Sequence, residues 1–151
     1  MSNTERFRLL AAAYIIIRKE NKVLLLKRAN TGYQDGNYGL PAGHLNGGEL
    51  ATHAAVREAK EEAGVVVRPE DVRLVFTDHR LDTGISPERI ELVFEATKWE
   101  GEPFNAEPEK CDDLSWYDLG DLPENMIPLV RAILNSIARG EIYAEHASEL
   151  E

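Results

Sequence analysis

One helix is the most strongly specified element of this chain. Residues 50–63 (LATHAAVREAKEEA) combine good helix formers without glycine or proline, and Gly64 follows, a residue suited to the left-handed conformation that ends helices. At about 100° per residue, three carboxylates fall within an arc of roughly 100°, namely those of Glu58, Glu61 and Glu62. Small or branched apolar side chains lie opposite them, at Val56, Ala59 and Ala63. The sequence therefore predicts a helix with an apolar back and an acidic front.

The acidic front of this helix favours a bound divalent cation. Carboxylates this close repel one another by roughly a few tenths of a kcal/mol per pair on a solvated helix, and by more when buried. Magnesium offsets the repulsion because it binds carboxylate oxygens and leaves positions for water and phosphate oxygens. The alternative is a solvated helix face in which Arg57 and Glu61 form a weak i,i+4 pair. The glycine-rich residues 41–49 favour the cation, since they let backbone carbonyls approach and place Glu49 at the helix entrance.

Segments typical of strands surround this helix and predict one α/β domain over residues 1–151. Residues 9–17 and 23–26 are apolar and rich in β-branched side chains, and the polar break between them predicts a hairpin. Further strands are predicted at residues 65–67, 72–76, 90–96 and 114–117. A second helix is predicted from Pro123 or Glu124 to Arg139. Residues 29–48, with six glycines, predict a long loop, and residues after Gly140 are expected to lack regular structure.

Composition restricts the partners and the location that this protein can have. Seventeen basic against 27 acidic residues give a net charge of −10, which disfavours binding to a nucleic-acid polymer. The single cysteine, Cys111, forms no internal disulfide and fits a reducing compartment. The apolar run near the N-terminus is too short to cross a membrane, and no targeting signal is visible. We therefore expect a cytoplasmic protein that binds neither nucleic-acid polymers nor membranes.

Residues 43–65 (GHLNGGELATHAAVREAKEEAGV) resemble the Nudix box, in which spaced glycine, glutamate and arginine positions are fixed. All of these positions are filled, by Gly43, Glu49, Arg57, Glu58, Glu61, Glu62 and Gly64. Ala59 departs mildly, being smaller than the usual aliphatic residue. The flanking segments, including LLLKR and YGLPAGH, are similar to the small MutT-like bacterial branch, so that the resemblance covers residues 9–139. It implies a Nudix-like α/β/α sandwich with a mixed β-sheet, the box as a loop–helix–loop, and a C-terminal helix.

This resemblance also implies a chemistry, the hydrolysis of a nucleoside diphosphate linked to a further group by attack of water on phosphorus. Mg²⁺ or Mn²⁺ would be held by Glu58, Glu61, Glu62 and the backbone carbonyl of Ala42. Arg57 and Glu49 would orient these ligands.

The implied substrate is a nucleoside or deoxynucleoside triphosphate, including oxidised or otherwise damaged ones, cleaved to a nucleoside monophosphate and pyrophosphate. Some relatives that act on ADP-ribose or dinucleoside polyphosphates carry a proline or tyrosine fifteen to eighteen residues after the box. Neither residue is present here, since residues 80–83 are Arg-Leu-Asp-Thr. The alternatives are another nucleotide, such as a nucleotide sugar or ADP-ribose, and a non-catalytic Nudix domain that senses or binds nucleotides. The resemblance also allows a homodimer.

Residues outside the box complete the expected site. Family members take the general base either from the box or from a later loop, where Glu109 is the first choice among four acids, Glu107, Glu109, Asp112 and Asp113. Arg28, at the end of the second strand, is expected to bind a phosphate. The alternative is that it is only an exposed residue at the end of the strand. Tyr38 and Tyr33 are expected to stack on a base or ring, or else to anchor their loop.

Overall fold

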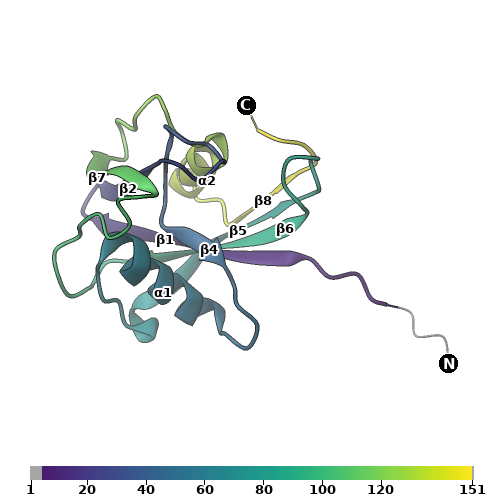
Figure 1. Ribbon diagram of the computed structural model, residues 1–151, viewed down its shortest axis with the longest axis horizontal. Coiled ribbons are helices and arrows are strands. Elements are labelled where there is room, and N and C mark those ends of the chain that lie inside the picture. The colour runs from purple at the N-terminus through teal and green to yellow at the C-terminus, as the bar shows by residue number, and fades with distance from the viewer. Residues whose placement is uncertain (1–4, 151) are drawn as a thin grey trace.

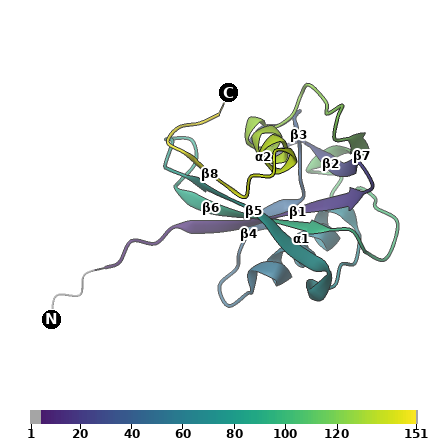
Figure 2. The same cartoon turned by 180° about the vertical axis from the view of Figure 1, so that it is seen from behind.

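The computed structural model describes residues 5–150, in which a mixed sheet of eight strands lies between two α-helices (Figures 1 and 2). The strands are β1 (Leu10–Lys19), β2 (Lys22–Arg28), β3 (Tyr38–Gly39), β4 (Ala42–His44), β5 (Val72–Arg80), β6 (Arg89–Ala96), β7 (Cys111–Asp118) and β8 (Tyr143–His146). The helices are α1 (Ala51–Ala63), α2 (Pro128–Ala138) and the 3-10 turn η1 (Pro69–Asp71). This arrangement confirms the predicted α/β/α sandwich.

Strand β1 joins the two halves of the sheet. It runs parallel to β6 from the pair Leu10–Arg89 to the pair Ile17–Ala96. On its other edge it pairs with β4 at residues 12–14 and with β2 only at residues 18–19. The predicted hairpin is therefore confined to its tip, and β2 diverges to pair with β3 and β7. Because β4 and β2 use different parts of one edge, a space opens between them.

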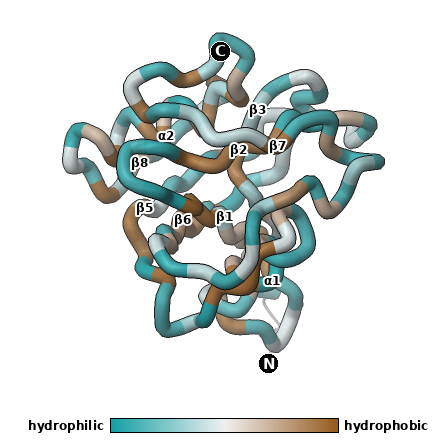
Figure 3. The backbone as a smooth tube through the Cα atoms, turned by 90° about the vertical axis from the view of Figure 1, so that its left-hand side faces the viewer, coloured by the Kyte–Doolittle hydropathy of each residue, from teal (hydrophilic) through white to brown (hydrophobic). Residues whose placement is uncertain are grey.

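Apolar layers on both faces of the sheet hold the helices. Helix α1 lies on β1 through fully buried alanines, such as Ala55 and Ala59, which pack with Ile15 and Phe94. On the opposite face α2 packs with a second cluster that includes Phe76. Figure 3 shows hydrophobic stretches along the central strands and hydrophilic connecting loops. Within residues 5–150 we find no helix with the length and apolar character needed to cross a membrane.

Four element predictions need correction. The predicted loop over residues 29–48 contains two short strands, β3 and β4. Residues 143–146 form β8, parallel to β5 from the pair Thr77–Tyr143 to the pair Arg80–His146, so the expectation of an irregular tail after Gly140 is wrong. Residues 65–67 form no strand but a single bridge, between Val66 and Glu100. Helix α2 begins at Pro128, because residues 124–125 form a bend and Met126 forms a bridge with Tyr38. The terminal residues 1–4 and 151 of the predicted domain lie outside the described part.

Candidate active site

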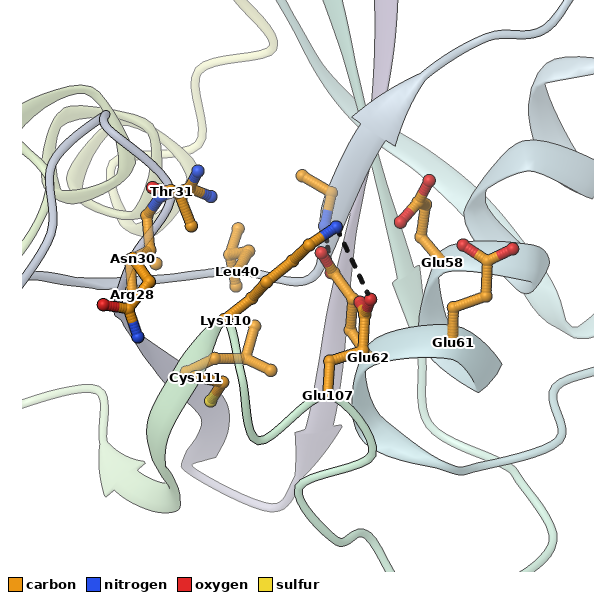
Figure 4. Close-up of a pocket in the computed structure, with 13 residues that line it drawn as sticks. Arg28, Asn30, Thr31, Leu40, Glu58, Glu61, Glu62, Glu107, Lys110 and Cys111 are labelled. Atoms are coloured by element: carbon orange, nitrogen blue, oxygen red, sulfur yellow. Dashed lines mark hydrogen bonds and ion pairs between the residues drawn. The ribbon is translucent and has the colours of Figure 1, made fainter.

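A cleft of about 460 Å³ lies between α1 and the diverging strand β2 (Figure 4). Its lining comes from strands β2, β3, β4 and β7, from helix α1, and from the loops after β2 and before β7. The lining residues are Leu26, Arg28, Asn30, Thr31, Gly39, Leu40, Ala42, Glu58, Glu61, Glu62, Glu107, Lys110 and Cys111. Figure 4 shows the three acids of α1 on one wall, with Arg28, Asn30 and Thr31 on the other. The cleft thus has one acidic wall and one wall that carries a cation and hydrogen-bonding groups.

A glycine on β4 lets the acidic wall form. A Cβ atom on Gly43 would lie 2.0 Å from Oε1 of Glu58. Only glycine therefore allows the side chain of Glu58 to lie against the strand, where it is 7% exposed. Glu58 Oε1 accepts a hydrogen bond from Nη1 of Arg57 at 2.7 Å.

Arg57 ties the entrance of the helix to its acids. Its Nε and Nη2 atoms donate to the two carboxylate oxygens of Glu49 at 2.8 and 3.0 Å, a bidentate pair. Nη1 also donates to Glu61 at 3.3 Å, and Nη2 to the carbonyl of His44 at 3.2 Å. The hydrogen bond from Arg57 lowers the pKa of Glu49 to about 2. Arg57 thus joins Glu49 to two of the cleft acids, Glu58 and Glu61.

Burial makes the acids of the cleft difficult to ionise together. Desolvation, followed by the charge of Glu58, raises the pKa of Glu62 to about 8, although the backbone N–H of Ala42 donates to Glu62 Oε2 at 2.8 Å. Desolvation also raises the pKa of Glu58. Glu107 adds to both upward shifts, which places a fourth carboxylate within electrostatic reach. A cation among these oxygens would favour their ionised forms.

The donor set fits a hard divalent cation. Among residues 5–150, no three acidic, histidine or cysteine side chains converge closely enough to enclose an ion by themselves. Mg²⁺ does not need such a cage, because it is usually bound by one or two carboxylates and keeps waters and substrate phosphate oxygens as its other ligands. Glu58, Glu61 and Glu62 supply carboxylate oxygens on one wall, and Ala42 lines the cleft beside them.

Two of the expected residues outside the box are placed elsewhere by the structure. The side chain of Glu109 is exposed and outside the cleft, whereas Glu107 lines the cleft. Tyr38 is 8% exposed, and its hydroxyl donates to Asp113 Oδ2 at 2.6 Å while its ring meets that of Tyr117 edge-on. Loop geometry thus places Glu109 outside the cleft, and core packing buries Tyr38 in the position of the alternative expected for it, an anchor of its loop.

Arg28 lies in the cleft, where it was expected. Its Nε atom donates to the carbonyl of Tyr33 at 2.8 Å, and its guanidinium lies 5.5 Å from the centre of the Tyr33 ring. Tyr33 therefore contacts Arg28 and has the second of its expected roles, that of an anchor of its loop.

The loop before β7 supplies two cleft residues: Glu107, one of the four acids considered above, and Lys110, which the sequence did not point to. The N–H groups of Phe104 and Ala106 donate to the carbonyls of Ala63 and Glu62 at the end of α1, at 3.0 and 3.3 Å. This attachment brings Glu107 and Lys110 to the cleft, where Lys110 Nζ lies 3.9 Å from Glu107 (Figure 4). No sequence signal separates Glu107 from Glu109, since both lie in one acidic, proline-containing segment.

The fold and the acidic cleft together define a class of protein, an α/β/α sandwich whose helix presents a row of glutamates behind a glycine-rich loop. The NUDIX domain family matches residues 7–136, and the chain belongs to this family. The resemblance seen in the sequence is thereby confirmed.

Individual relatives agree with this assignment. The chain is 33% identical over 115 residues to a protein of Methanocaldococcus jannaschii named ADP-ribose pyrophosphatase, covering 72% of this chain and 62% of that protein. It therefore spans less than two thirds of the length of this relative. A crystal structure of a MutT NUDIX hydrolase from Burkholderia pseudomallei superposes with a TM-score of 0.78 at 26% identity, over 85% of this chain and 98% of that one. For a MutT protein from Bacillus halodurans the TM-score is 0.70 at 26% identity, over 93% and 91% of the two chains.

Proposed function

We propose that this protein is a hydrolase that depends on a divalent metal, Mg²⁺ or Mn²⁺, and cleaves a nucleoside diphosphate linked to a further group. The observation that carries the proposal is the intact row of acids on α1, in a cleft whose other wall carries Arg28. A non-catalytic nucleotide sensor would not need this row. A (deoxy)nucleoside triphosphate is the first candidate substrate, with a nucleoside monophosphate and pyrophosphate as its products. ADP-ribose is the second, because the archaeal relative carries that name.

The residues of the cleft divide the work of this reaction. Glu58, Glu61, Glu62 and the carbonyl of Ala42 would hold the metal, which when bound neutralises phosphate oxygens and lowers the pKa of water. Arg28 and Lys110 bind phosphate oxygens, since both are cations lining the cleft. Glu107 accepts the proton of the attacking water as the P–O bond of the pyrophosphate breaks. Arg57 and Glu49 position Glu58 and Glu61 and touch no substrate.

Product analysis with a matched pair of variants tests this function. Phosphate and pyrophosphate release would be measured across triphosphates, nucleotide sugars, ADP-ribose and dinucleotides, with and without Mg²⁺. We expect cleavage that depends on the metal and falls by about 100-fold or more in Glu62→Gln. The exposed Glu102→Gln serves as the control and should leave the rate unchanged. Nucleotide binding without cleavage of any substrate would instead identify a sensor.

Location and assembly are part of the same proposal. A cytoplasmic location is supported by the single, buried Cys111. A homodimer is supported by exposed apolar residues, Ile142 and Tyr143, at and beside the edge strand β8. Sedimentation equilibrium would distinguish the 16.9 kDa monomer from a species of twice that mass.

A further inference from the structure

A second group of charged side chains lies buried in the sheet, apart from the acids of the cleft. Asp78 and Arg80 on β5 and Glu91 on β6 are each at most 1% exposed, and we call these three residues the buried ionic cluster. Arg80 Nη2 lies 3.6 Å from Glu91 Oε1, which also accepts a hydrogen bond from the hydroxyl of Tyr14 at 3.3 Å. Arg89 Nε lies 2.8 Å from the same oxygen.

The hydrogen-bonding capacity of the cluster is incompletely used. Within the described residues, Asp78 Oδ2, Arg80 Nε and Glu91 Oε2 are buried with neither a hydrogen bond nor an ion pair, whereas Asp78 Oδ1 and Arg80 Nη2 each have a charged neighbour. Buried charged atoms in this condition are costly, and apolar side chains of similar size are often equally or more stabilising. The cluster is therefore poorly explained by folding stability, and its three unpartnered atoms, Asp78 Oδ2, Arg80 Nε and Glu91 Oε2, are positions that a ligand can satisfy.

The C-terminal segment covers this cluster, and we call residues 143–149 the strap (Figure 1). His146 Nε2 lies 2.7 Å from Asp78 Oδ1. The two carboxylate oxygens of Glu149 contact Arg80 Nη1 at 3.3 Å and accept a hydrogen bond from the hydroxyl of Thr83 at 2.6 Å. Only the four residues of β8 pair with the sheet, so the strap is held by a short edge strand and by these side chains.

Contacts lead from the cleft to the buried ionic cluster. Ala42, which lines the cleft, pairs with Tyr14 on the neighbouring strand, and Tyr14 bonds to Glu91. Tyr33 supports Arg28 at the cleft and also lies near Arg80. Although burial opposes it, Glu91, Tyr33 and Glu149 together raise the pKa of Arg80. The cluster therefore adjoins the cleft, separated from it by one strand and one loop.

We propose that the buried ionic cluster and Thr83 form a second binding site, for an oxygen-rich group such as the second ribose of a substrate, and that Glu149 closes this site as a latch. The inference rests on the proposed function. Because the Glu149 carboxylate accepts from both Arg80 and Thr83, the group that replaces it must supply acceptor oxygens. The unsatisfied oxygens of Asp78 and Glu91 accept in turn from the hydroxyls of that group.

Calorimetric titration of ADP-ribose without metal tests the latch, because binding is then measured without turnover. The variants are Glu149→Gln, which keeps an acceptor but removes the charge, and a chain ending at Ala147, which removes the latch and leaves β8 intact. We expect the Kd for ADP-ribose to fall about fivefold in both, the effect of releasing one partly exposed ion pair. Glu145→Gln is the matched control on the same strap, since that carboxylate is exposed and, among residues 5–150, accepts its one side-chain hydrogen bond from the hydroxyl of Tyr143.

The same titrations include dATP, which has no second ribose, and its Kd should change less than about twofold. An unchanged Kd for ADP-ribose in both variants, no binding of ADP-ribose by any variant, or equal tightening for dATP would each overturn the proposal. Failure of the proposed function would be seen separately. If the wild-type protein cleaves no nucleotide with metal, but the Kd for ADP-ribose still falls in the two Glu149 variants, the proposed function is wrong and the second site stands.

Discussion

Gly43 decides how closely Glu58 can approach strand β4. A Cβ atom on Gly43 would lie 2.0 Å from Oε1 and 2.4 Å from Cδ of Glu58, so a methyl group there would collide with this carboxylate. The backbone of Gly43 does not have a positive φ, so an alanine there meets only this collision and no backbone strain. The position thus isolates the placement of one carboxylate from the stability of the fold.

The variant Gly43→Ala is expected to lose activity while remaining folded. Displacement of the Glu58 carboxylate by about 1 Å should lower kcat about 100-fold. Gly47→Ala is the matched control, because a Cβ there meets nothing within 4 Å and its φ is not positive. Steady-state rates and circular dichroism of both variants check the prediction. Equal activity of Gly43→Ala and Gly47→Ala would contradict the role of this contact.

At the scale of elements, the side chain of Asn105 closes the turn before β7, in addition to the backbone bonds that join this loop to α1. Asn105 Nδ2 donates to the carbonyl of Cys111 at 2.6 Å, and its Oδ1 accepts from the N–H of Glu107 at 3.2 Å. Asn105 therefore joins both ends of the turn that carries Glu107 and Lys110, and it acts as a positioning residue for them.

Replacement of Asn105 by alanine should lower kcat about tenfold and change KM little, because the turn then holds Glu107 less firmly. Asn125→Ala removes a comparable hydrogen bond, to the carbonyl of Gly36 at 2.9 Å, and should leave kcat unchanged. Rates at saturating and limiting substrate give the two parameters. A change confined to thermal stability, with kcat intact, would show that Asn105 is only structural.

The end of α1 joins this loop through Gly64, which has a φ of 69° and whose Cβ would lie 2.2 Å from the Phe104 ring. Gly64→Ala should lower the free energy of unfolding by about 1 kcal/mol for the left-handed backbone and by roughly 1–3 kcal/mol more for the collision. Gly140→Ala, with a φ of 79° and no neighbour within 4 Å, should show the first cost alone. Urea unfolding measures both. Equal losses in the two variants would mean that Phe104 moves away freely.

Elements with strong local signals could be predicted from the sequence, and those made by distant contacts could not. Helix α1 was expected at residues 50–63 and is Ala51–Ala63, because helix formers and Gly64 act locally. Glu58, Glu61 and Glu62 share the cleft because their spacing puts them on one helix face, and Arg28 reaches it from the end of β2. Glu107 rather than Glu109 reaches it only because the loop is bonded to the end of α1. Tyr38 is buried by its contact with Asp113, which is 75 residues away in sequence.

At the scale of the whole molecule, the C-terminal segment completes the sheet. The polar sequence after Gly140 gives no strand pattern, yet β8 pairs with the edge of β5. The reason lies in charges that are remote in sequence, because His146 faces Asp78 and Glu149 faces Arg80. The tail is therefore ordered by buried charges that need partners.

A chain ending at Gly140 should accordingly be destabilised by about 3 kcal/mol or more, because it leaves Asp78 and Arg80 without their partners on the strap. A chain ending at Ala147 keeps β8 and the contact of His146 with Asp78, and Arg80 keeps Glu91, so the loss should be less than half as large. Denaturant unfolding of both chains beside the full-length protein gives the two differences. If the chain ending at Gly140 unfolds at the same denaturant concentration as the full-length protein, the buried charges do not depend on the strap. In that case β8 would be a passive addition to the sheet edge, and the contact between Glu149 and Arg80 would carry no measurable energy.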